Sequence, residues 1–146
     1  MNTKEIPATQ AIAPRPPYIL VVDDHEFRRQ WTKRALAGGR YRVYAVDSAQ
    51  QGLRYLRQVW FDVVVVGEHL RGMGATRFQA EIQHRYPDIR TVVVAFTWPV
   101  GRNVGTLSPG GYHCLLLCTQ DPQREEALRT KIEEALAHAP GEKAES

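Results

Sequence analysis

The feature that most constrains the fold is a regular alternation of short apolar segments with amphipathic helical patterns. Residues 18–22 (YILVV), 63–66 and 91–96 are largely apolar runs of strand length, as expected of strands that are buried on both faces of a sheet. Residues 41–46 and 112–117 complete a set of five candidate strands. Strands that alternate with helices predict a parallel sheet covered by helices on both sides.

The helical patterns lie between these strands. Apolar residues recur at helical spacing at Phe27, Trp31 and Ala35, at Leu53 and Leu56, at Phe78 and Ile82, and at Leu128, Ile132 and Leu136. Gly38 and Gly39 end the first pattern, and Pro87 ends the third. Ser48, with Gln51 three positions later, predicts the N-terminus of the second. The last helix is expected to span residues 125–138.

Five such units predict a flavodoxin-like, doubly wound α/β fold with five parallel strands in the order 2-1-3-4-5. One interval departs from the pattern. Residues 97–111 (TWPVGRNVGTLSPGG) are rich in proline and glycine, which are poor helix formers. A parallel sheet still requires a crossover there. We therefore expect a short or distorted helix, or a loop, where the fourth helix should lie.

The length of 146 residues fits one domain with one core. Residues 1–17 contain four prolines and predict a disordered arm, residues 18–138 form the domain, and residues 139–146 predict a flexible tail. The N-terminus has no apolar signal-peptide core, and no apolar run approaches the roughly 20 residues that span a bilayer. These observations predict a cytoplasmic protein without a membrane partner.

The two cysteines and the net charge exclude further classes. Cys114 and Cys118 lie on one predicted strand, roughly 13 Å apart, which is beyond the reach of a disulfide, so two reduced thiols are predicted. His113 would face away from Cys114, which argues against a zinc site. The net charge of +3 is mildly basic, and no nucleic-acid-binding motif accompanies it. Nucleic acid is therefore not the expected partner.

Several segments, in order and with near-gapless spacing, resemble the receiver domains of two-component response regulators. They are VVDDHEF, YRVYAVDSAQQGL, FDVVVV, YPDIRTVVV and the Gly-Gly pair before the last strand. The resemblance runs from Tyr18 to His138. It implies that Asp23 and Asp24 correspond to an acidic pair that helps to hold magnesium. It also implies an aspartate that accepts a phosphoryl group from a histidine kinase, a hydroxyl residue and a lysine. A divalent cation and fixed positive charge offset the negative charge that accumulates during such a transfer.

The chain departs from this pattern at each of the last three positions. The acceptor position, five residues after Asp62, is Gly67. The hydroxyl position falls on Ala95, with Thr97 two residues away, and the lysine position falls on Leu117 or its neighbour Leu116. A proline usual after the acceptor is replaced by Arg71. These losses together predict a pseudo-receiver that cannot be switched by phosphotransfer.

What is left at the strand ends is an acidic pocket of Asp23, Asp24 and Glu68. Two carboxylates without a third predict weak magnesium binding or none, and no other cofactor is expected. Asp24 has a second interpretation, as the N-cap of the first helix. Glu68 is either a solvated loop carboxylate, a permanent negative charge or, one residue out of register, a substitute acceptor. His25 and His69 flank the pocket.

The predicted function is a non-enzymatic protein-interaction module in bacterial signalling or gene regulation. The altered segment lies on the usual output face, where Trp98, Arg102 and Tyr112 are the candidate contacts. Candidate partners are a histidine kinase, a transcription regulator or a second copy of the chain. Two alternatives stay open: a small-molecule or metal sensor that uses the vacated pocket, and a phosphoacceptor receiver that uses Glu68.

Overall fold

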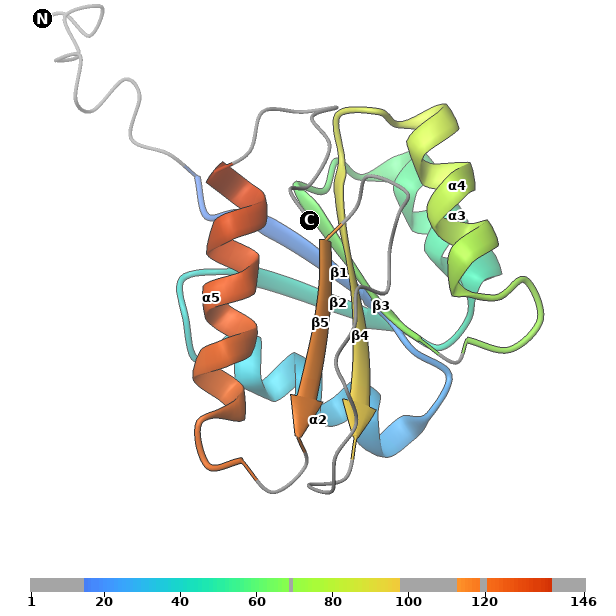
Figure 1. Cartoon of the computed structure of the whole chain (residues 1–146). Helices are drawn as coiled ribbons and strands as arrows, with labels where there is room; N and C mark the ends of the chain where they lie inside the picture. The colour runs from blue at the N-terminus through green and yellow to red at the C-terminus, as the bar shows by residue number, and fades with distance from the viewer. Residues whose placement is uncertain (1–14, 69, 98–112, 119–120, 138–146) are drawn as a thin grey trace, which may run out of the picture.

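A parallel β-sheet forms the centre of the protein in the computed structural model, which describes residues 15–68, 70–97, 113–118 and 121–137 (Figure 1). The strands run in the order β2-β1-β3-β4-β5. Their bounds are β1 Tyr18–Val22, β2 Arg42–Val46, β3 Val63–Gly67, β4 Arg90–Thr97 and β5 His113–Cys118. The helices are α2 Glu26–Ala37, α3 Ala49–Gln58, α4 Ala75–Arg85 and α5 Arg124–Ala137.

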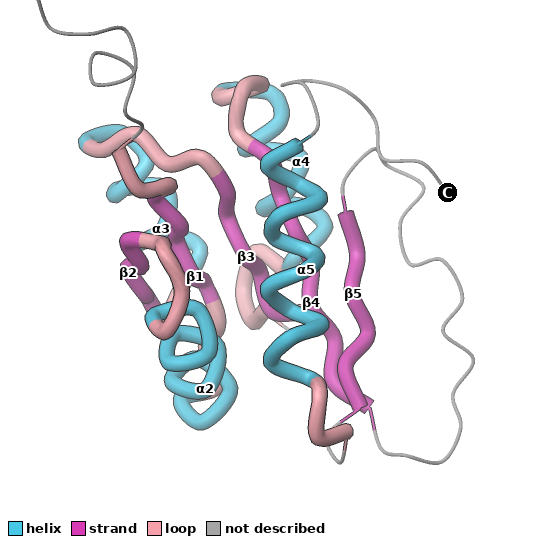
Figure 2. Tube along the Cα trace, turned by 90° about the vertical axis from the view of Figure 1, so that its left-hand side faces the viewer, coloured by secondary structure: helices cyan, strands magenta, loops and turns pink. Residues whose placement is uncertain are grey.

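The helices cover both faces of the sheet. Leu56 of α3 and Phe78 of α4 pack with one set of alternate strand residues, such as Leu20 and Val64. The opposite face packs against α2 and α5, and Leu36, Ile132 and their neighbours form the second cluster with the other strand residues. Figures 1 and 2 show the two layers. Because successive strand side chains enter opposite clusters, the strands are apolar at nearly every position.

The predicted flavodoxin-like α/β fold, with parallel strands in the order 2-1-3-4 and helices on both faces, is confirmed. The register continues into β5, which pairs with β4 from Val92↔His113 to Thr97↔Cys118. The predicted helix start at Ser48 is also confirmed, since its side chain accepts a hydrogen bond of 3.1 Å from the backbone N–H of Gln51. Ser48 thus satisfies one of the free N–H groups at the start of α3.

Two contacts attach the ends of the domain to its centre. The backbone N–H of Arg42 donates to the carbonyl of Pro17, so the ordered contacts begin before Tyr18. On the opposite face, Glu133 of α5 accepts hydrogen bonds from the side chains of Arg40 and Tyr41, which precede β2. These bonds hold the pKa of Glu133 below its ordinary value. They attach α5 to the turn between α2 and β2.

Several predictions fall outside the described residues. They concern the arm up to residue 14, the altered segment 98–112 and the tail from residue 138. The side chains of His113, Cys114, Leu116 and Cys118 are likewise outside the described part of the chain, as is His69. Among the described helices, none is long and apolar enough to cross a membrane.

Candidate functional site: an acidic pair neutralised by arginines

The carboxyl ends of β1 and β3 bring Asp23 next to Gly67. Val22 and Val66 are partners in the parallel register, so the residues that follow them are neighbours. Asp23 is only 4% exposed. A Cβ atom built on Gly67 would lie 2.5 Å from Oδ2 of Asp23 and 2.7 Å from its Cγ. The space that a side chain at position 67 would enter is therefore filled by the Asp23 carboxylate, and Gly67 does not leave the expected room for a ligand there.

The carboxylate of Asp23 is held in place by its own neighbours in the chain. The backbone N–H of His25 donates to Oδ1 at 2.9 Å. The guanidinium of Arg28 donates from Nε to Oδ2 and from Nη2 to Oδ1, both at 3.3 Å. Arg28 lies in the first turn of α2, one helical turn after the acidic pair. A buried carboxylate thus has a cation and a hydrogen-bond donor, as burial of charge requires.

The N-cap of α2 is His25, and the interpretation of Asp24 as the cap is wrong. Nδ1 of His25 accepts a hydrogen bond of 3.3 Å from the backbone N–H of Arg28. The helix begins one residue later than the sequence suggested, so the carboxylate of Asp24 lies outside the capping position. His25 is exposed, and its side chain serves as the N-cap of α2.

Asp24 binds Arg71, across 47 positions of sequence. Oδ2 of Asp24 accepts from the backbone N–H of Arg71 at 2.8 Å and from its Nε at 2.9 Å. The Asp24 side chain is 13% exposed, whereas that of Arg71 is 85% exposed. Partial burial by itself would raise the pKa of Asp24. The hydrogen bonds from Arg71 and the charges of Arg71 and Arg28 outweigh this effect, so the pKa lies below its ordinary value.

The loop that presents Arg71 depends on glycine. Gly72 and Gly74 have φ angles of 78° and 84°, in the region that other residues rarely adopt. Both lie in the connection between β3 and α4, and Gly74 is the N-cap residue of α4. The backbone of Glu68 continues the ladder beyond β3, because its N–H donates to the carbonyl of Val94 at 2.9 Å. Whether Glu68 acts as a charge or as an acceptor stays a prediction.

A family model described as the response regulator receiver domain matches residues 19–115, about two thirds of the chain. The chain belongs to the response regulator receiver domain family. One curated relative is the response regulator GacA from Pseudomonas viridiflava, which is 33% identical over 78 residues. That match covers 52% of this chain and 36% of GacA, so the matched part spans only about a third of the length of this relative.

Solved structures agree on the fold of this receiver domain. The signal receiver domain of an HD domain-containing protein from Pseudomonas fluorescens Pf-5 superimposes with a TM-score of 0.70 at 23% identity, over 85% of this chain and 97% of that one. The response regulator TrrA from Thermotoga maritima, solved in complex with Mg²⁺ and BeF, gives a TM-score of 0.67 at 18% identity, over 82% and 99% of the two chains.

The residues predicted to stand at the hydroxyl and lysine positions lie on β4 and β5. Ala95 is 3% exposed and pairs in register with Leu116. Leu117 is 2% exposed and belongs to the core cluster beneath α2 and α5. Both side chains are buried, apolar parts of this receiver domain. Of the predicted site residues, the structure brings Asp23, Asp24 and Gly67 together at the carboxyl ends of β1 and β3.

Sequence reasoning missed the two arginines that complete the site. The sequence pattern did not single out Arg28, and it marked Arg71 only as a replacement for proline. The spacing of Arg28, five residues after Asp23, was a usable signal because it equals little more than one helical turn. Arg71 had no comparable signal, since its partner is remote in sequence.

The acidic pair in this arrangement does not fit a magnesium ion. Magnesium requires near-octahedral oxygen ligands, usually from carboxylates, waters and a phosphate. Here both carboxylates already face guanidinium groups, which repel a cation and bind both oxygens of Asp23 and Oδ2 of Asp24. Among the described residues, no group of three or more His, Cys, Asp or Glu side chains could hold a metal.

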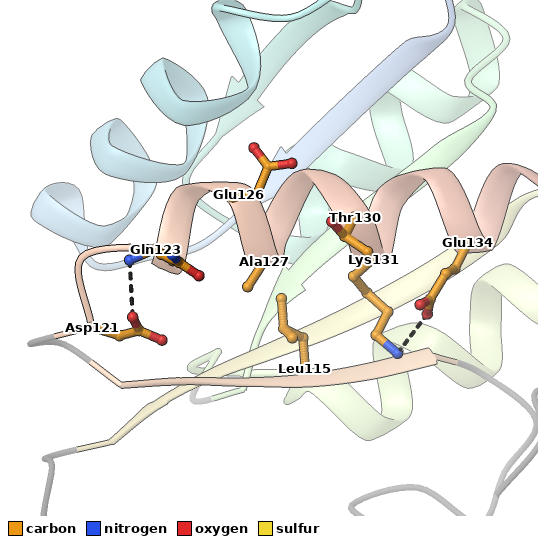
Figure 3. Close-up of a pocket in the computed structure, with 8 residues that line it drawn as sticks. All are labelled: Leu115, Asp121, Gln123, Glu126, Ala127, Thr130, Lys131 and Glu134. Atoms are coloured by element: carbon orange, nitrogen blue, oxygen red, sulfur yellow. Dashed lines mark hydrogen bonds and ion pairs between the residues drawn. The ribbon is translucent and has the colours of Figure 1, made fainter.

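A groove at the β5 edge of this receiver domain lies between β5 and α5 (Figure 3). Its volume is about 350 Å³. Leu115 and Ala127 give it an apolar floor, and Lys131 bonds to Glu134 at 3.1 Å along its rim. The remaining lining residues are Asp121, Gln123, Glu126 and Thr130. The candidate contacts Trp98, Arg102 and Tyr112 lie outside the described residues.

Replacing Arg71 with alanine should remove a modest, pH-dependent stabilisation. Asp24 has a lowered pKa in the folded state, so its contact stabilises the fold above the ordinary pKa of 3.8 and is lost as the pH falls through the folded value. Because Arg71 is largely exposed, we expect a loss of about 0.5–1 kcal/mol at neutral pH. Urea unfolding of both proteins between about pH 3 and 7 measures it. Arg77→Ala on α4 is the matched control and should show no such pH dependence.

Proposed function

We propose that this protein is a pseudo-receiver: a protein-interaction module whose state is not set by phosphorylation. Receiver domains act in two-component signalling through protein partners, and the proposal concerns how this one departs from the rest. It rests on one observation above the others. The place of the acceptor side chain is occupied by the carboxylate of Asp23, which Arg28 and the His25 N–H hold there.

The two arginines take over the electrostatic role of a bound cation. In a phosphorylated receiver, magnesium and lysine offset the charge of the acidic pair and the phosphoryl group. In this protein Arg28 and Arg71 offset the charge of Asp23 and Asp24 without an external ion. The negative charges of Asp23 and Asp24 are then balanced by side chains of the protein itself, whether or not an ion is bound. Because a receiver works by a shift between two populations, a permanently neutralised pocket favours one fixed state.

The surface that remains for a partner includes the groove between β5 and α5. Its apolar floor and charged rim have the composition of a protein contact rather than of a closed ligand site. A histidine kinase, a transcription regulator or a second copy of the chain are the candidate occupants. We propose no enzymatic activity, because the described part of the pocket has neither a nucleophile at Gly67 nor a group of side chains that could hold a metal ion.

The space beside Gly67 is filled by the carboxylate of Asp23, which disfavours the alternative of a small-molecule sensor.

The alternative in which Glu68 is a substitute acceptor can be tested by a phosphorylation assay. Incubation with acetyl phosphate and Mg²⁺, followed by intact-mass measurement, should show no added phosphoryl group. A receiver domain that has aspartate at this position is the positive control. Phosphorylation of the unmodified protein that disappears in Glu68→Gln would contradict the proposal and establish Glu68 as the acceptor.

A further inference from the structure

A set of exposed aromatic residues lies at the β2 edge of the sheet, away from the acidic pair. Tyr44 of β2 is 36% exposed, Tyr55 of α3 is 38% exposed and Trp60, just after α3, is 46% exposed. Together with the exposed Arg42 and Arg54, they form what we call the β2 edge patch. Exposed tyrosine, tryptophan and arginine are the residues that most often dominate binding energy at protein interfaces.

The two tyrosine rings of this patch are fixed by aromatic contacts. Tyr44 stacks on Tyr18 with ring centroids 6.1 Å apart, meets Phe61 edge-on at 5.8 Å and contacts Tyr55 at 6.4 Å. Phe61 is fully buried and anchors the group to the core. A surface with rings that are already ordered loses little side-chain entropy when it binds.

The charge of the patch has one sign. No hydrogen bond or ion pair engages the side chain of Arg42 or Arg54 within the described part of the chain, and α3 itself contains no acidic residue. The nearby carboxylate of Asp62 has a cation of its own, because Nη1 of Arg15 lies 3.6 Å from its Oδ2. Asp62 also accepts from Trp60 Nε1 at 3.3 Å and from the backbone N–H of Tyr18 at 2.9 Å. The patch therefore complements a negatively charged segment.

The backbone offers a second element of recognition. Among the described strands, β2 is the terminal one and pairs with β1 alone, so its outer side presents backbone N–H and C=O groups to an added strand. Arg42 and Tyr44 stand two positions apart and share one face of that strand. An added strand would place its own alternate side chains beside them, as in recognition by β-strand addition.

We propose that an acidic, extended segment of a partner protein binds the β2 edge patch by adding a strand to β2. Its carboxylates pair with Arg42 and Arg54, and its apolar side chains pack on Tyr44, Tyr55 and Trp60. The inference rests on the proposed role as an interaction module, but not on the loss of phosphotransfer. Peptide is favoured over single-stranded nucleic acid because the outer edge of β2 offers backbone N–H and C=O groups that an added peptide strand can pair with and a nucleic acid cannot.

A fluorescent peptide of alternating glutamate and leucine tests the proposal against the full chain by anisotropy. We expect binding that weakens about tenfold or more when Arg42 and Arg54 are both replaced by glutamate, since like charges then face each other. Arg34→Glu together with Arg77→Glu, on exposed positions of α2 and α4, is the matched control and should leave binding unchanged. Amide shifts in ¹⁵N NMR spectra should concentrate in residues 42–46.

Three results would overturn this assignment. One is equal binding by the wild type and the Arg42→Glu, Arg54→Glu variant, and another is equal binding of a peptide with alternate N-methylated amides, which cannot pair with a strand. The third is tight binding of oligo-dT with none of the acidic peptide, which would make the patch a nucleic-acid surface. The acetyl phosphate assay is independent of all three, so either proposal can fail without the other.

Discussion

Replacing Gly67 with aspartate is expected to destabilise the protein by about 3 kcal/mol and not to restore phosphotransfer. The new Cβ would lie within 2.5 Å of Oδ2 of Asp23, whose carboxylate is held by Arg28 and the His25 N–H. Either the Asp23 carboxylate moves and loses these bonds, or the backbone shifts. The new carboxylate would also lie beside that of Asp23 in a buried site where the guanidinium of Arg28 already pairs with Asp23. Chemical denaturation measures the change in unfolding free energy.

Two further substitutions at Gly67 separate the causes. Gly67→Ala adds only the Cβ and should cost about 1–3 kcal/mol through steric overlap. Gly67→Asn introduces a side chain of the size of aspartate without its charge. The difference in unfolding free energy between Gly67→Asp and Gly67→Asn therefore reports the like-charge repulsion. The account would be contradicted by a stable Gly67→Asp protein that accepts a phosphoryl group from acetyl phosphate, because the pocket would then lack nothing but its nucleophile.

Replacing Arg28 with alanine is expected to cost about 2–3 kcal/mol of unfolding free energy. The reason is the burial of its partner, since the side chain of Asp23 is 5% exposed and would keep only the hydrogen bond from His25. Arg28→Ala removes the paired cation from a carboxylate that is almost fully buried. The loss should therefore exceed that of Arg71→Ala, whose guanidinium lies at the surface.

A double-mutant cycle assigns this loss to the pair. Asp23→Asn in the Arg28→Ala background should recover part of the stability, because the buried charge is removed together with the need for its partner. Lys33→Ala, on an exposed position of the same helix, is the control for helix propensity. Additive effects of Arg28→Ala and Asp23→Asn would show that the two side chains do not stabilise each other.

Much of the fold could be predicted from the sequence because the strands are buried on both faces. Continuous apolar runs such as residues 63–66 have few other interpretations, and Ser48 and Pro87 delimit helices through local chemistry. The start of α2 was missed by one residue, since His25 competes with Asp24 for the same capping role and only the geometry decides between them.

The site was predicted only in part, for a reason that lies in its contacts. Gly67 and the acidic pair could be placed because each directly follows or ends an apolar strand, and that position is visible in the sequence. The filling of the space at Gly67 by Asp23, and the bond between Asp24 and Arg71, depend on how separate segments meet. Pairings between residues so remote in sequence, 47 positions apart for Asp24 and Arg71, leave no local pattern.

The central claim is that arginines, and not a metal ion with a phosphoryl group, complete the acidic pair. Its most direct test is a ¹⁵N NMR titration of the unmodified protein with Mg²⁺ and then with beryllofluoride, a mimic of the phosphoryl group. The account predicts no saturable shifts of the amides of Asp23, Asp24, Gly67 and Arg71 at millimolar Mg²⁺, and no further change on addition of beryllofluoride. Saturable shifts at these amides that require both reagents would contradict it and restore a conventional, phosphorylation-dependent switch.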